Sequence, residues 1–155
     1  MNKCLNLLTD TGYAIFILTD RRCGGTIPKH YYCIDEAYKL GFTLVAHKIS
    51  YEKIETIDLY KPTFSHLLIF TKKGKIRCNI PDIFDGGEKS YCNANGYRCI
   101  EYAVDFLAKY NIVDVIDPFV GEGTTLKIAK TRNFKRCVGI DIDKRQTQKI
   151  KSKIL

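Results

Sequence analysis

Residues 115–125 read VIDPFVGEGTT, and this stretch decides the fold. Its apolar start predicts a buried strand that ends at Asp117, and Gly121 and Gly123 predict a turn directly after that strand. The residues that follow show the apolar spacing of a short helix. Such a strand–turn–helix lets a ligand approach the backbone at the glycines and presents unpaired N–H groups at the start of the helix.

An acidic residue follows the next predicted strand. Residues 137–140 read CVGI and predict that strand, and Asp141 comes directly after it. In nucleotide-binding α/β sites, an acid at this position accepts hydrogen bonds from ribose hydroxyls. The run lacks the third glycine of a dinucleotide site, so we expect no diphosphate ligand. We expect Thr124 or Thr125 to cap the helix.

Apolar periodicity along the rest of the chain predicts further strands and helices. Strands are expected at residues 13–19, 43–49, 65–71, 112–116 and 137–140. Helices are expected at residues 2–9, 28–40, 97–110, 124–131 and 144–154. Residues 72–93 combine glycines and prolines with weak periodicity, which predicts a long loop. The alternation predicts an α/β fold with an open, mostly parallel sheet.

The composition limits the class of protein. A chain of 155 residues with 45% hydrophobic and 27% charged residues suits one folded domain and excludes a disordered chain. It contains no apolar run of the ~18 residues that a membrane span needs. Twenty-five Lys and Arg against 17 Asp and Glu give a net charge of +8, which suits a polyanion such as nucleic acid. The alternative is that the lysines serve solubility alone.

Seven cysteines are present, and no pair has the C-x-x-C spacing of a zinc site. We therefore expect no metal ligands and read the cysteines as reduced thiols. The first ten residues are too short and too polar for a secretory leader. Together these features predict an intracellular, cytoplasmic protein with no membrane partner.

Two segments carry a resemblance to a known family. Residues 117–125, DPFVGEGTT, closely resemble the D-P-F-x-G-x-G-T-T motif of S-adenosylmethionine-dependent DNA methyltransferases that modify exocyclic amino nitrogens. Residues 138–143, VGIDID, resemble the strand and the ribose-binding acid that follow in that family. The resemblance implies a Rossmann-like class I methyltransferase fold with S-adenosyl-L-methionine as cofactor. The cofactor-binding residues that it implies are Asp117, Pro118, Phe119, Gly121, Gly123, Thr124, Thr125, Asp141 and Asn95.

The position of this motif near the end of the chain resembles the circularly permuted arrangement of many of these methyltransferases. On that basis we expect residues 1–155 to form one domain, truncated relative to the family. It has a substrate-side half at 1–72, a loop at 73–96 and a cofactor-binding half at 97–155. Residues 43–49 and 65–71 would then include the antiparallel edge strand of the sheet.

The family's catalytic motif, [DNS]-P-P-[YFW], is missing, since the sequence has no Pro-Pro dipeptide. In a permuted enzyme the catalytic strand and loop would precede residues 2–9, so we expect a domain without its third and fourth strands. Three explanations stay open. A separate subunit supplies the motif; the chain is an inactive cofactor- or nucleic-acid-binding module; or it uses its own residues on an unusual acceptor. A second subunit and a homodimer are both possible assemblies of this chain. DNA is the preferred nucleic acid over RNA.

Polar residues in the first half are weaker candidates for function. Asp20 follows the strand at 13–19, and His66 opens the strand at 65–71, so both are candidate catalytic residues. Arg21, Arg22 and Lys29 are candidate contacts to nucleic-acid phosphates. The alternative is that none of the five has a function of this kind: the polar residues after the strand would form a solvated turn, and His66 would be a structural histidine.

Overall fold

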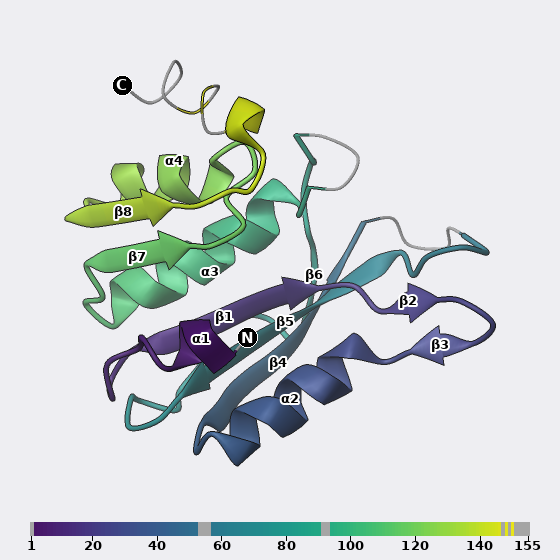
Figure 1. Ribbon diagram of the computed structural model, residues 1–155, viewed down its shortest axis with the longest axis horizontal. Coiled ribbons are helices and arrows are strands. Elements are labelled where there is room, and N and C mark those ends of the chain that lie inside the picture. The colour runs from purple at the N-terminus through teal and green to yellow at the C-terminus, as the bar shows by residue number, and fades with distance from the viewer. Residues whose placement is uncertain (1, 53–56, 91–93, 147, 149, 151–155) are drawn as a thin grey trace. The chain divides into compact units, whose positions relative to one another are not determined.

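The computed structural model describes residues 2–52, 57–90, 94–146, 148 and 150 (Figure 1). These residues divide into two compact units, Met1–Gly86 and Gly87–Leu155. Each unit is a mixture of helices and strands, so the predicted α/β class is confirmed at that level. In the described part of the chain, no helix is long and apolar enough to span a membrane.

A four-stranded sheet forms the first unit. Its strands are β1 (Tyr13–Leu18), β4 (Thr43–Tyr51), β5 (Phe64–Thr71) and β6 (Ile83–Asp85), in the order β1-β5-β4-β6. β5 pairs antiparallel with both β1 and β4, and β4 pairs parallel with β6. β5 therefore lies inside the sheet and aligns Leu18, at the end of β1, with His66, near its own start.

The pairing in this sheet differs from the mostly parallel sheet that the sequence predicts. β4 and β5 are consecutive along the sequence in this sheet and pair directly as antiparallel neighbours, whereas a parallel pair would need a crossover connection. The predicted antiparallel pairing of the strands at 43–49 and 65–71 is confirmed, but their predicted place at the edge is wrong, because β1 and β6 flank them in the sheet. The short strand β6 was not predicted, because three residues inside the segment 72–93 are too few to show a period.

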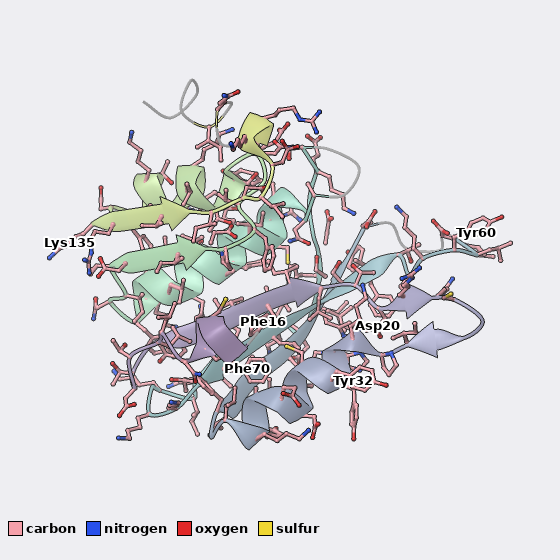
Figure 2. The ribbon with its side chains drawn as sticks, viewed as in Figure 1. Phe16, Asp20, Tyr32, Tyr60, Phe70 and Lys135 are labelled. Carbon is pink, nitrogen blue, oxygen red and sulfur yellow. The ribbon has the colours of Figure 1, made fainter. Side chains whose placement is uncertain are left out.

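Two helices pack on one face of this sheet. α1 (Asn2–Leu5) and α2 (Lys29–Lys39) contribute Leu5 and Ala37 to a buried cluster with Leu68 and Phe70 of β5. The Phe16 and Phe70 rings meet edge to face, with their centroids 6.0 Å apart. Both residues are labelled in Figure 2. Because β5 is buried on this face by apolar residues of both helices, it anchors the unit.

Between β1 and α2 the chain forms a small hairpin. Its strands, β2 (Arg21–Arg22) and β3 (Thr26–Ile27), pair antiparallel and are exposed. The sequence predicts only a turn here, because a two-residue strand has no recognisable pattern. The hairpin presents Arg21 and Arg22 at the surface directly after β1.

In the second unit a parallel strand pair packs with the helices α3 and α4. Its elements are α3 (Tyr97–Lys109), β7 (Asp114–Asp117), α4 (Thr124–Thr131) and β8 (Arg136–Gly139). β7 and β8 pair parallel, as the sequence predicts for this half. The Arg132 guanidinium at the end of α4 bonds Glu101 and Asp105 of α3, at 2.9 and 2.7 Å.

The longer predicted helices are confirmed. α2, α3 and α4 match the predicted ranges 28–40, 97–110 and 124–131 within one residue at each end. The helix predicted at 144–154 begins as expected at 144–146, but most of the rest lies outside the described residues.

We expect Thr71→Val to destabilise the protein by about 1–3 kcal/mol, because buried polar groups would lose their partner. The Thr71 hydroxyl donates to the Gly12 carbonyl at 2.8 Å and accepts the Gly74 N–H at 2.9 Å. Urea unfolding measures the change. The matched control is Thr43→Val, at the exposed residue opposite Thr71 on β4, which should change stability by less than about 0.5 kcal/mol. Equal stability of the two variants would contradict the account.

Candidate functional site

The turn between β7 and α4 carries most of the residues singled out in the sequence. The chain leaves β7 at Asp117 and enters α4 through Gly123, which has φ +81°. Gly121, with φ +51°, adopts the same left-handed region, which side chains disfavour. The strand–turn–helix predicted from the glycines is therefore present, with both glycines where the backbone requires them.

The first turn of α4 differs from the prediction. Gly123 is the N-cap residue, and no side chain forms a capping hydrogen bond, so the expectation that Thr124 or Thr125 caps this helix is wrong. Both threonines already lie inside the helix, as its first two residues. α4 thus begins without a side-chain acceptor on its first N–H groups, and its dipole places partial positive charge there.

Asp141 connects this turn to the strand β8. One carboxylate oxygen, Oδ2, accepts the Gly121 N–H at 2.9 Å, and Oδ1 accepts the Asp143 N–H at 2.8 Å. The backbone adds two further bonds, from the Val120 N–H to the Ile140 carbonyl at 3.0 Å and from the Ile140 N–H to the Asp117 carbonyl at 2.8 Å. The acid that sequence reasoning placed beyond the second strand therefore contacts the glycine turn directly.

The remaining predicted residues of this unit lie at the edges of the turn. The Asp117 carboxylate accepts the Phe119 N–H at 3.0 Å on Oδ1. The Phe119 ring is 87% exposed, and Pro118 is half-buried beside it. Asn95 is exposed and lies just before Gly96, the N-cap of α3. No interaction among the described residues ties Asn95 to the glycine turn.

A close packing contact holds β8 against the same turn. A Cβ atom on Gly139 would lie 2.7 Å from Val120 Cγ2 and 2.9 Å from Leu126 Cδ1, which is inside van der Waals contact. Both side chains are buried. Gly139 belongs to the stretch 138–143 that resembles a family motif. The close contact explains why a residue without a side chain is needed at this position.

In the first unit, Asp20 and all three histidines of the chain form one cluster. Asp20 is 7% exposed and lies between the end of β1 and the start of α2 (Figure 2). Its Oδ2 lies 2.8 Å from His30 Nδ1 and 3.4 Å from His66 Nε2. The backbone N–H of His30 donates to Asp20 Oδ1 at 3.2 Å. His47 Nε2 lies 2.8 Å from His66 Nδ1.

The protonation of these groups follows from burial and mutual contact. Burial raises the pKa of Asp20, but the hydrogen bonds and charge of His30 outweigh it, so this pKa lies below its usual range. Burial lowers the pKa of His66, and the nearby His30 lowers it further. The same two causes lower the pKa of His47. Near neutral pH, Asp20 is therefore ionised, and His66 and His47 are neutral.

Sequence reasoning found two members of this cluster and missed the other two. The candidates Asp20 and His66 come together because β5 runs antiparallel to β1. His30 and His47 had no distinguishing pattern, since they approach from α2 and β4, 10 residues from Asp20 and 19 from His66. One sequence signal could have pointed to His30. It is the second residue of the helix α2, and an acid, Asp20, comes shortly after the strand β1 that precedes this helix.

The predicted phosphate contacts lie on the hairpin and at the start of α2. Arg21 and Lys29 are exposed and have no ion-pair partner among the described residues, whereas the Arg22 guanidinium donates to the Asp58 carbonyl. Beside them is an open hollow of about 400 Å³. Its lining residues are Arg22, Cys23, Gly24, Gly25, Thr26, Leu59 and Tyr60.

Comparison with known proteins gives no match to any protein-family model and none to a curated protein. Solved structures do match. TTHA0409 from Thermus thermophilus, which carries the name DNA modification methylase, is 23% identical, with a TM-score of 0.71 over 97% of this chain and 73% of that one. Its complex with S-adenosyl-L-methionine is 25% identical, with a TM-score of 0.69 over 97% and 72%. The M1.HpyAVI–SAM complex is 17% identical, with a TM-score of 0.70 over 97% and 78%. The chain therefore has the fold of these DNA methylases.

We expect Gly139→Ala to destabilise the protein by about 1–3 kcal/mol, because the added methyl overpacks the contact with Val120 and Leu126. Chemical denaturation followed by circular dichroism measures the loss. Ile142→Ala, at a fully exposed side chain three residues later, serves as the control and should be nearly neutral. A Gly139→Ala protein as stable as the control would show that β8 and the turn separate without cost.

Proposed function

We propose that this chain is a permuted S-adenosylmethionine-binding domain that takes part in methyl transfer to an exocyclic amino nitrogen of a nucleic-acid base, with DNA preferred over RNA. The observation that carries the proposal is the bond between the Asp141 carboxylate and the Gly121 N–H at 2.9 Å. It links the glycine turn to the acid at the end of the next strand, which is the arrangement that nucleoside ligands use in α/β sheets. The solved methylases of the same fold include complexes with this cofactor.

The residues around the turn suit the chemical groups of the cofactor. The carboxylate of Asp117 uses Oδ1 for the Phe119 N–H, and its second oxygen has no partner among the described residues, so it can accept an ammonium group. Each oxygen of Asp141 accepts one backbone N–H and retains a lone pair for a ribose hydroxyl. The uncapped start of α4 favours a carboxylate. When bound, the cofactor supplies the methyl group on its sulfonium.

The acceptor side of the reaction is less complete in this chain. Methylation of an exocyclic amine needs an acceptor group for the amine's hydrogens beside the methyl donor, and the sequence has no Pro-Pro motif to provide it. Asp20 is a poor substitute, because His30 already occupies both of its oxygens. We therefore propose that a second subunit of different sequence supplies this motif.

A second candidate function is a module that binds the cofactor or nucleic acid without catalysing transfer. The observation that favours it is the same engagement of Asp20, which withdraws the first unit's buried carboxylate from chemistry. Incubation of the chain with tritiated S-adenosylmethionine and DNA, alone and with a partner that carries the missing motif, separates the two. Label in DNA only with the partner supports a split enzyme, and no label in either case supports the binding module.

The surface of the first unit supports a nucleic-acid partner. Arg21 and Lys29 place two cations near the start of α2, where Tyr31 and Tyr32 are 60% and 58% exposed. Figure 2 shows the Tyr32 ring extending away from the helix. Cations beside exposed aromatic rings match the backbone charge and the faces of unpaired bases.

We expect Asp117→Ala to weaken binding of S-adenosylmethionine at least tenfold in calorimetric titration, because a charge-assisted hydrogen bond is lost. Asp114→Ala, on the same strand but paired with Arg136, is the matched control and should bind as the unmodified chain does. Circular dichroism verifies that both variants are folded. Equal affinity of the two variants would refute the assignment of this turn to the cofactor.

We expect the double variant Arg21→Ser with Lys29→Ser to weaken DNA binding and to make its salt dependence shallower. Loss of two phosphate contacts should reduce the slope of log K against log[salt] by about 2. Fluorescence anisotropy with a labelled duplex and a labelled single strand measures both quantities. Lys75→Ser with Lys109→Ser removes the same charge elsewhere on the exposed surface. If both double variants give the same slope, the hairpin is not the contact.

A further inference from the structure

The three histidines of the chain come from three different elements and gather around one carboxylate, which two of them contact directly. Asp20 follows β1, His30 lies in the first turn of α2, His66 lies near the start of β5, and His47 lies on β4. The sequence contains no other histidine. The gathering is produced by the fold and not by sequence neighbours, since the pairs in contact are separated by 10 and 19 residues.

Three donor atoms of this cluster have the spacing of a metal site. One ligand atom each from Asp20, His30 and His66 lies within 4.8 Å of the others. In a tetrahedral zinc site with bonds of about 2.0–2.1 Å, neighbouring ligand atoms are about 3.3 Å apart. Asp20 Oδ2 and His66 Nε2 are 3.4 Å apart, and Asp20 Oδ2 and His30 Nδ1 are 2.8 Å apart. A zinc ion would require the second distance to open by about half an ångström, with the His30 and His66 ligand atoms, which already lie within 4.8 Å of each other, turned toward the ion.

A buried nitrogen in the cluster lacks a hydrogen bond. His66 is 5% exposed, and its Nε2 makes no hydrogen bond in the described part of the chain, although it lies near Asp20 Oδ2. Buried polar atoms are nearly always satisfied in folded proteins, and each exception needs a cause. A cation between Nε2 and the Asp20 carboxylate would satisfy this nitrogen.

The groups around these donors orient them for coordination. His47 Nε2 lies 2.8 Å from His66 Nδ1, so a proton held on that Nδ1 and donated to His47 leaves the Nε2 lone pair available. The backbone N–H of His30 holds Asp20 Oδ1 at 3.2 Å, and a cation on Oδ2 would replace the contact that this oxygen now makes with His30 Nδ1 at 2.8 Å. Outer partners of this kind fix the ligands in known metal sites.

We propose that Asp20, His30 and His66 bind one divalent transition-metal ion of the zinc class, with His47 as a positioning residue. Two imidazoles and one carboxylate favour zinc over magnesium or calcium, which take oxygen ligands. The fourth position falls to water or to a substrate group. The ion replaces the proton that His30 shares with Asp20, and the His30 and His66 rings, now stacked at 4.0 Å and 21°, turn apart to admit it.

Such an ion would join the ends of elements that are remote in sequence. It would fasten the end of β1, the first turn of α2 and the start of β5, at the base of the β2–β3 hairpin. The hairpin carries Arg21, so metal binding would order the surface that we assign to nucleic acid. The proposal itself rests on the cluster alone and does not require the cofactor site.

Histidine-specific NMR provides the decisive test, because every imidazole of the chain belongs to the cluster. The full chain, labelled with ¹⁵N-histidine and stripped with a chelator, is titrated with Zn²⁺. We expect saturation at one equivalent, coordination shifts at His66 Nε2 and at one nitrogen of His30, and a retained Nδ1 proton on His66. Zinc that binds without moving these resonances would overturn the proposal, as would the lack of saturable binding.

Variants test the same site with an independent measurement. Calorimetry should give a Zn²⁺ affinity at least tenfold weaker for Asp20→Asn and for His66→Gln, and about 10–100-fold weaker for His47→Gln. Asp35→Asn, on an exposed part of α2, and Cys23→Ser, at an exposed thiol, are the matched controls and should bind as the unmodified chain does. Loss of binding in Cys23→Ser but not in His66→Gln would assign the metal to thiols and refute the histidine site.

Discussion

A carboxylate that follows a strand fixes the start of a helix or of its entry turn in each unit of this protein. Asp20 follows β1 and accepts the backbone N–H of His30 in the first turn of α2, and Asp141 follows β8 and accepts the Gly121 N–H in the turn before α4. Helix starts have N–H groups without intrahelical partners and a positive dipole end. A carboxylate accepts a hydrogen bond from such an N–H group and carries the negative charge that the dipole end favours. The position of each candidate site follows from this contact.

Helices and strands were predicted correctly where many residues repeat one apolar spacing, and they were missed where an element has too few residues to show such a repeat. The buried stripe of α3 is long enough to define its face, and its helix was predicted within one residue. β2, β3 and β6 have two or three residues each, and their pairing is decided by partners that are distant in sequence. The direction of β5 did not follow from its own residues, because an apolar run is equally suited to parallel and antiparallel neighbours, and its antiparallel pairing with β4 was predicted only from the family resemblance.

The two candidate sites differ in how visible they are to sequence analysis. The turn before α4 and the acid after β8 belong to consecutive elements, and short connections between a strand, a helix and the next strand leave a pattern that can be read along the chain. The His30–His66 contact joins α2 to β5 across the sheet, with no local requirement that a pattern would record. A cluster assembled from single histidines can therefore be recognised only once the strand pairing is known.

The net charge of +8 says less about partners than the pairing of individual cations does. Lys39, Lys73 and Arg136 form ion pairs on the surface, and such pairs direct their charge to the protein's own carboxylates. Arg21 and Lys29 have no such carboxylate among the described residues, so their charge stays available to a polyanion. The argument for a nucleic-acid partner therefore rests on the unpaired cations that lie beside exposed aromatic rings. The positive net charge is compatible with such a partner but does not identify it.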